Sequence, residues 1–177
     1  CGTICHKAFT ELSDRHGFQP FFSGPEAAIG LVSEQLSHPA YYSVIAELDG
    51  RVVGSNFLDE RSTIAAIGPI SIDPAVQKGE IGRLLMRDVL ERAEKQHFPG
   101  VRLVQEAYNS ESLSLYAELG FEVREPLALI QGHPLAVRIP GYAVRPATEN
   151  ELEACDQMSI KVHGHHRSGE LLDAIKA

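Results

Sequence analysis

The chain has 177 residues, of which 44% are hydrophobic and 23% charged, and its formal net charge is −8 at pH 7. This composition is typical of a folded globular protein rather than a disordered chain, and the acidic balance argues against nucleic acid as a partner. The apolar runs, such as residues 44–46 and 64–67, are far shorter than the roughly 18 residues that a membrane-crossing helix needs, so no membrane span is expected.

The first 36 residues predict two helices. Apolar side chains recur at helical spacing over residues 2–16, and Gly17 and Pro20 follow as stop signals. A second apolar stripe runs through residues 25–36, with Pro25 in the first turn, where proline is tolerated.

The pattern then changes to that of strands. Residues 41–48 and 51–58 flank Asp49-Gly50, which is a strong hairpin signal. Residues 64–73 form a third run that is apolar nearly throughout, as expected for a strand covered on both faces, and Pro74 closes it.

Helices and strands alternate from there. We predict a helix over residues 79–96, a short strand over 101–105, a helix over 110–119 and a strand over 121–130. Asn109 is a good N-cap for the helix over residues 110–119, and Gly120 is a good stop signal for it. The order predicts an α/β fold with one mixed central sheet flanked by helices.

The C-terminal part begins with a linker. Residues 132–141 carry two glycines and two prolines. A strand is predicted over residues 142–146, a helix after the capping box formed by Thr148 and Glu151, and a further helix from Ser168.

Residues 70–85 carry a candidate anion site. They read as a strand, a short polar turn containing Gly79, and an amphipathic helix. The first turn of a helix leaves amide N–H groups unpaired and has a positive dipole, which together favour phosphate. Lys78 and Arg83 add positive charge. An ordinary strand-to-helix turn remains the alternative for this stretch alone.

Residues 109–121 carry a second pattern. Asn109 stands at a helix start, Tyr116 follows about two turns later, and the helix stops at Gly120-Phe121. A tyrosine beside a bound thioester can protonate a departing thiolate. The alternative for Tyr116 is a half-buried core aromatic residue.

The two patterns together resemble the GNAT family of acetyl-CoA-dependent N-acyltransferases. Gln77, Ile81 and Gly82 fit its phosphate loop, Gln/Arg-x-x-Gly-x-Gly/Ala, and Asn109, Tyr116, Gly120 and Phe121 match its Asn-x(6)-Tyr-x(3)-Gly-Phe pattern in full. The resemblance covers about residues 1–131. It implies transfer of an acetyl group from acetyl-CoA to a primary amine by direct attack.

The resemblance also implies roles for individual residues. Tyr116 would act as the general acid. The cofactor-binding set would be Ile70, Ser71, Ile72, Gln77, Lys78, Gly79, Glu80, Ile81, Gly82, Arg83 and Asn109. A carboxylate would take a proton from the amine, and Glu60 and Asp59 are the candidates, with Glu47 weaker; each can equally be a solvated or salt-bridged carboxylate at the sheet edge.

One loop position departs from the family. Glu80 stands where the family has glycine, and Gly79 comes one residue early. Either Glu80 turns outward and Gly79 takes over, or cofactor binding is weakened. We expect the first, and we expect Glu80→Gly to tighten acetyl-CoA binding.

The chain therefore divides into a GNAT domain over residues 1–131 that lacks its first strand, a linker over 132–141, and the truncated β-α start of a second GNAT-like copy over 142–177. A single domain with an unrelated helical tail is the alternative. The strand at 142–146 is a candidate to fill the slot of the missing first strand, within one chain or between two copies in a homodimer.

The remaining expectations concern location, metals and rival functions. The cysteines are odd in number and no pair has CxxC spacing: they are Cys1, Cys5 and Cys155. We also recognise no signal peptide, and both observations favour a reducing, cytoplasmic location. His163, His165 and His166 lack further ligands nearby, so no metal site is predicted. The rival to catalysis is a non-catalytic CoA-binding or structural domain, and a different phosphate-loop protein is a third reading. The acceptor is not identified by the sequence.

Overall fold

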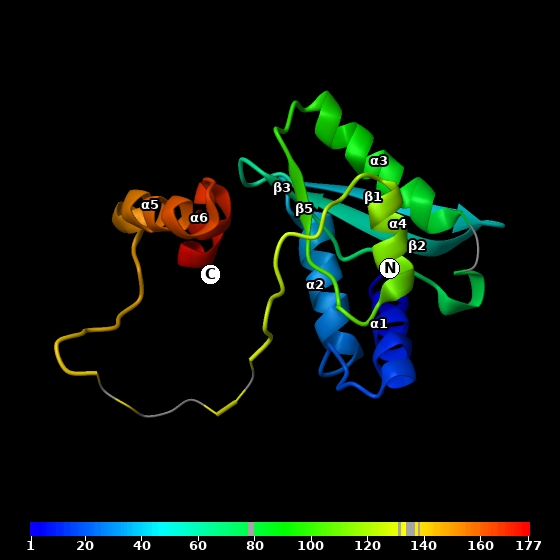
Figure 1. Ribbon diagram of the computed structural model, residues 1–177, viewed down its shortest axis with the longest axis horizontal. Helices are drawn as coiled ribbons and strands as arrows, with labels where there is room; N and C mark the ends of the chain where they lie inside the picture. Colours follow the sequence, from blue (N-terminus) through cyan, green and yellow to red (C-terminus); the bar gives the residue numbers. More distant parts are fainter. Residues whose placement is uncertain (78–79, 131, 134–136, 138) are drawn as a thin grey trace.

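The computed structural model describes residues 1–77, 80–130, 132–133, 137 and 139–177. An α/β core is followed by a pair of C-terminal helices that lies beside one end of the core (Figure 1). Among the described residues, no helix combines the length and the apolar character needed to cross a membrane.

The core is built on a mixed five-stranded sheet. Its strands are β1 (Tyr41–Leu48), β2 (Arg51–Asp59), β3 (Ala65–Ile67), β4 (Ser71–Ile72) and β5 (Val101–Leu103). The order is β1-β2-β3-β5, and β4 also pairs with β2. Among the strands of the described residues, β3 and β5 alone pair in parallel, and the crossover between them contains a helix, as a parallel connection requires. The predicted mixed sheet is thus confirmed.

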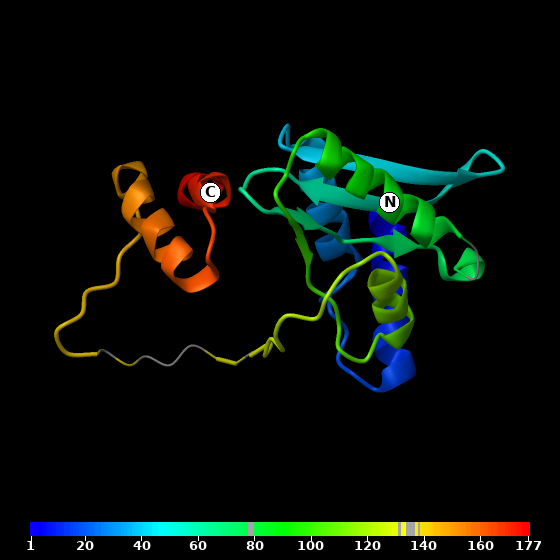
Figure 2. The same cartoon turned by 45° about the horizontal axis from the view of Figure 1, so that its top comes forward.

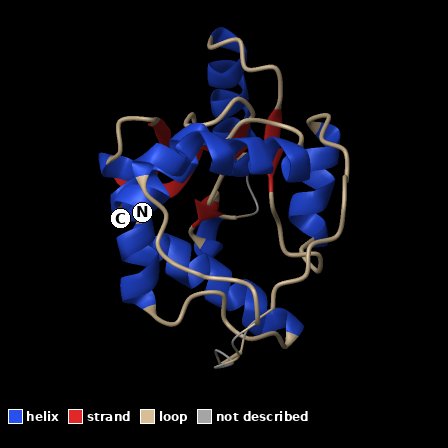
Figure 3. Ribbon diagram, turned by 90° about the vertical axis from the view of Figure 1, so that its left-hand side faces the viewer, coloured by secondary structure: helices blue, strands red, loops and turns tan. Residues whose placement is uncertain are grey.

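Helices cover both faces of this sheet (Figures 2 and 3). Helices α1 (Gly2–His16) and α2 (Pro25–Ser37) enclose one core cluster with Phe57 of β2. Helix α3 (Ile81–Lys95) and α4 (Ser110–Glu118) enclose the other with Leu58. Neighbouring residues of β2 therefore face opposite cores, which explains why β2 is buried along most of its length.

The Asp-Gly turn forms as predicted. β1 and β2 pair antiparallel from Tyr41–Asp59 to Leu48–Arg51, and Asp49 and Gly50 both have positive φ, at 51° and 72°. That backbone conformation suits a tight hairpin between twisted strands.

The third predicted strand is divided in two. β3 pairs with β2 at Leu58, whereas β4 pairs with β2 at Gly54 and Ser55 in a register shifted by one residue. The extra residue lies in the intervening Gly68–Pro69 segment, where Gly68 has φ of 124°. This is the behaviour of a β-bulge, and it interrupts the ladder that the apolar run predicted as continuous.

Two further predicted strands are wrong. Residues 121–130 and 142–146 have no strand conformation, although both runs are apolar enough. Val123, Leu129 and Ile130 are exposed, and Val144 is fully so. A strand exists only where a neighbour accepts its backbone hydrogen bonds, and neither run has one among the described residues. The idea that residues 142–146 extend the sheet within one chain is therefore also wrong.

The C-terminal helices form where predicted. The Thr148–Glu151 capping box is present at a 3₁₀ turn, η2 (Glu149–Glu151), which leads into α5 (Leu152–His163) and α6 (Ser168–Lys176). The pair contacts the β2–β3 turn through polar groups: Arg61 donates to Asp173 at 3.0 Å, and Thr63 N donates to His166 O at 3.3 Å.

Candidate active site

The segment predicted to hold the cofactor connects β4 to α3. After β4 comes a short 3₁₀ turn, η1 (Pro74–Val76), capped by Asp73, whose carboxylate accepts from Ala75 N at 3.1 Å and from Lys7 Nζ at 3.0 Å. Both hydrogen bonds lower the pKa of Asp73, and the one from the Ala75 amide has the larger effect. Gln77 Nε2 donates to the carbonyl of Ile72 at 3.1 Å and so links the turn back to β4.

The N-terminus of α3 has the features of an anion site. Glu80 is its N-cap residue, and its side chain makes no cap hydrogen bond. The first-turn amides of an α-helix have no partner within the helix, so they are candidates to bind an anion. Gly82 faces β4 and α4: a Cβ there would lie 3.2 Å from Ile72 Cδ1 and 3.5 Å from Leu115 Cδ2. Glycine therefore lets the start of α3 sit close to both elements. The predicted Lys78 and Gly79 lie outside the described residues.

Glu80 points outward. Its side chain is 76% exposed and accepts from Arg83 Nε at 2.9 Å, while Arg83 Nη2 donates to Glu118 at 2.5 Å. The hydrogen bond to Glu118, followed by the charges of both carboxylates, raises the pKa of Arg83. This is the outward orientation that the sequence favoured for Glu80.

Asn109 and Tyr116 lie on α4. Asn109 Oδ1 accepts from Ser112 N at 3.2 Å and Asn109 Nδ2 donates to Ser112 Oγ at 2.8 Å, so the side chain caps the helix. Tyr116 is 6% exposed within the core cluster shared with α3. Burial raises its phenol pKa, against a smaller opposite effect of Ser112.

The candidate bases are both engaged in ion pairs. Glu60 follows β2 and accepts from Arg92 Nε at 2.7 Å and Nη2 at 2.9 Å, in a bidentate contact with α3. Asp59 lies at the end of β2, where its carboxylate binds Arg61 at 2.7 Å and Tyr41 at 3.1 Å. Neither carboxylate contacts a described member of the predicted cofactor-binding set.

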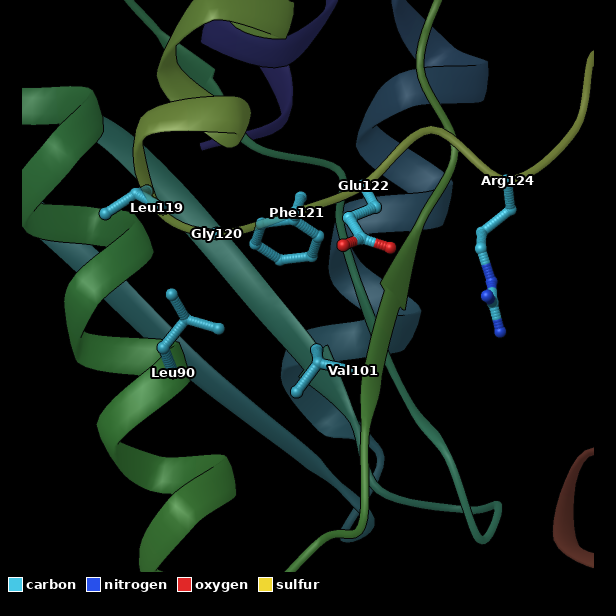
Figure 4. Close-up of a pocket in the computed structure, with 7 residues that line it drawn as sticks. All are labelled: Leu90, Val101, Leu119, Gly120, Phe121, Glu122 and Arg124. Atoms are coloured by element: carbon cyan, nitrogen blue, oxygen red, sulfur yellow. The ribbon is translucent and has the colours of Figure 1, made fainter.

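Two pockets flank these elements. One, of about 390 Å³, lies along β5 between α3 and the chain that follows α4, and no described residue of the predicted site lines it (Figure 4). Its lining residues are Leu90, Val101, Leu119, Gly120, Phe121, Glu122 and Arg124. The other, of about 260 Å³, lies between residues 44–47 of β1 and the first half of α3, and Ile81 lines it. The second is therefore closer to the candidate anion site.

Two long-range contacts, one at the start of α3 and one beside the Gly68 bulge, were not predicted from the sequence. Glu118 joins Arg83 from α4, and Gln35 of α2 donates from Nε2 to Gly68 O at 3.2 Å, with its Oε1 buried and unbonded. Both contacts join residues more than 30 positions apart, and no local spacing signals them. In the described part of the chain, no group of three or more histidine, cysteine or acidic side chains is arranged to hold a metal.

Comparison with known proteins supports the same family. The model of the acetyltransferase (GNAT) family matches residues 7–121. A mycothiol acetyltransferase of Brachybacterium faecium is 46% identical over 59 residues, a match that spans 33% of this chain and only 18% of that protein.

Solved structures share the fold at low identity. A protein of Bacillus halodurans described as a transcriptional regulator superimposes with a TM-score of 0.59 and 17% identity, covering 73% of this chain and 92% of that one. The PaiA N-acetyltransferase of Thermoplasma acidophilum, solved with coenzyme A, gives a TM-score of 0.58 and 16% identity, covering 71% and 83%. With the family match extending over the sheet, the α3 N-terminus and the Asn109–Tyr116 helix, the chain belongs to the acetyltransferase (GNAT) family.

Proposed function

We propose that the domain binds acetyl-CoA at the β4–α3 connection and transfers the acetyl group to a primary amine. The observation that carries this proposal is the N-terminus of α3, where the Glu80 side chain makes no cap hydrogen bond, and which lies after β4 and the 3₁₀ turn η1 and inside the family match. The first-turn amides of Ile81, Gly82 and Arg83 would hold the diphosphate. Strand β4, with Ile70 before it, would offer backbone groups to the pantetheine arm.

The chemistry that follows is direct transfer. The neutral amine forms a C–N bond to the acetyl carbon as the C–S bond breaks, and the amine loses one proton while the thiolate gains one. Tyr116 would supply the thiolate's proton, since a tyrosine phenol is protonated at neutral pH and burial raises the pKa of Tyr116 further. Glu60 would take the amine's proton, which requires its carboxylate to leave Arg92.

Thiol release from acetyl-CoA tests this proposal. The assay uses a panel of small amines, aminoglycosides and peptide N-termini, and it compares wild type with Tyr116→Phe. We expect amine-dependent release that falls about 10²-fold or more in the variant while CoA binding is kept. Tyr142→Phe is the matched control, because Tyr142 is 81% exposed in the C-terminal segment. Equal rates for wild type and Tyr116→Phe would remove Tyr116 from the mechanism.

A second candidate function is CoA binding without turnover. The observations that favour it are the burial of Tyr116, 6% exposed, and the bidentate engagement of Glu60 by Arg92. Calorimetric CoA binding in the absence of thiol release with every amine would support this candidate over the first.

We also propose that residues 142–177 are the opening of a second GNAT-like unit. Supporting this, α1 and α5 both end in a His-Gly pair, with Gly17 and Gly164 in the left-handed conformation, and each is followed by another helix. An experimental structure in which α5–α6 superimposes on α1–α2 is the expected result. A clearly different crossing geometry would favour an unrelated helical tail.

A further inference from the structure

Arg83 sits between two carboxylates at the start of α3. Its Nε donates to Glu80 Oε2 at 2.9 Å within the same helix, and its Nη2 donates to Glu118 Oε2 at 2.5 Å in the last turn of α4. One cation is therefore shared by two anions. The cluster carries a net charge of −1 immediately beside the amides that the proposed function assigns to a diphosphate.

Carboxylates and phosphates use the same donors of a guanidinium. Both accept paired hydrogen bonds from its planar N–H edge, so they compete for one arginine rather than share it. This competition acts against CoA, and it originates from side chains that no local motif required.

We propose that Glu80 and Glu118 compete with the CoA diphosphate for Arg83, so that this three-residue cluster sets the affinity of the domain for CoA. The inference rests on the proposed function, which places the diphosphate at the N-terminus of α3. CoA binding draws the Arg83 guanidinium away from the two carboxylates and onto a phosphate oxygen.

The exposure of the cluster makes this exchange feasible. The side chains of Glu80 and Glu118 are 76% and 54% exposed, and that of Arg83 is 29% exposed. Ion pairs in such surroundings are weak and break readily in water. Each carboxylate is therefore expected to reduce CoA affinity by about three- to fivefold, and the two together by about tenfold.

Calorimetric titration with CoA tests the cluster. We expect Glu118→Gln and Glu80→Gln each to tighten binding by about three- to fivefold, and the double variant by about tenfold. Glu91→Gln is the matched control, since it removes one carboxylate from the far half of the same helix, where Glu91 pairs with Lys95 at 3.7 Å. The control should bind CoA as wild type does.

Two further titrations show whether Arg83 mediates the effect. In an Arg83→Gln background the gain from Glu118→Gln should disappear. Binding of pantetheine, which has no diphosphate, should be the same in wild type and Glu118→Gln. A gain that persists without Arg83, or that appears equally with pantetheine, overturns the inference.

The outcomes separate this inference from the function on which it rests. If wild type binds CoA and neither carboxylate variant binds it more tightly, the competition is wrong and the proposed function stands. If no variant binds CoA at all, both fail. Thermal unfolding of each variant completes the test: a Glu118→Gln protein that is less stable and binds CoA more weakly identifies the Arg83–Glu118 pair as a structural link between α3 and α4, which also overturns the inference.

Discussion

The α/β core and the C-terminal helical pair are held by different forces. The core contains fully buried apolar side chains such as Phe57, Leu58 and Met86. In α5 the buried residues are Asp156 and Ser159, both polar, and α6 has no buried residue. Hydrophobic burial depends little on pH or salt, whereas hydrogen-bonded ion pairs depend on both. We therefore expect the fold of the core to be insensitive to pH and salt, and the attachment of the helical pair to depend on both.

Glu170 is the centre of that attachment. Its carboxylate binds Ser62 of the β2–β3 turn, Arg102 of β5 at 2.8 Å and Arg167 at 3.0 Å. Burial acts to raise its pKa, but the hydrogen bonds from Arg167 and Ser62 and the nearby arginine charges outweigh burial and lower the pKa to about 2. The helical pair is thus joined to the sheet by a partly buried carboxylate that stays ionised.

The largest effect should come from the core. Phe57→Ala removes a ring that is 0% exposed in the cluster shared with α1 and α2, and we expect a loss of about 3–5 kcal/mol in the free energy of unfolding. Urea denaturation followed by circular dichroism measures it. Val52→Ala on the same strand is the control, because Val52 is 37% exposed and should cost less than about 1 kcal/mol. A loss at position 57 as small as the control's would contradict this view of the core.

A steric change at the junction should detach the helical pair without unfolding the core. In Gly169→Ala the new Cβ would lie 2.3 Å from the Arg61 carbonyl oxygen, so α6 has to move, at a cost of about 1–3 kcal/mol. Hydrogen exchange should then be faster over residues 152–176 and unchanged in β2. Gly30→Ala, at a helical glycine with open space around it, is the control. Unchanged exchange in α5 and α6 would mean that the junction does not hold them.

Lowering the pH should detach the C-terminal helical pair from the core over a defined pH range. The folded-state pKa of Glu170, about 2, lies below its ordinary value of 4.5. Its stabilisation is therefore complete above about pH 4.5 and is lost as the pH falls toward 2. Amide chemical shifts of Ser62 and α6, followed by NMR, should titrate in this window in wild type and not in Glu170→Gln. A transition centred near pH 4.5 would show that the carboxylate is not held by its arginine partners.

The smallest effect is expected at an exposed ion pair on the core. Lys7→Ala removes the ion pair between Lys7 of α1 and Asp73. Because the Lys7 side chain is 50% exposed, the loss should change the free energy of unfolding by less than about 1 kcal/mol. The change should shrink further at high salt. A salt-independent loss of 2 kcal/mol or more would show that this pair matters to the core in a way that screening does not explain.

The same contrast explains what the sequence could predict. Helical periodicity located α1 and α3, and Asp49-Gly50 located the hairpin, because these signals act between near neighbours. The GNAT motifs predicted the family for the same reason, and the family model matches residues 7–121. The strand predicted over residues 121–130 failed because pairing depends on a neighbour that no local pattern supplies.

Long-range polar contacts could not be predicted from the sequence either. Arg61 and its partner Asp173 are 112 positions apart in the sequence, and Arg83 and its partner Glu118 are 35 positions apart. Charged side chains are common on any surface, so their partners become known only once the backbone is folded. The outward orientation of Glu80 could be argued from the repulsion between a carboxylate and a phosphate, but its partner Glu118 could not.

An experimental structure with CoA tests the central claim most directly. The account predicts that the diphosphate lies within hydrogen-bonding distance of the amides of Ile81, Gly82 and Arg83 at the start of α3. A CoA molecule seated in the pocket along β5, or a protein that takes up no CoA at millimolar concentration, would contradict it.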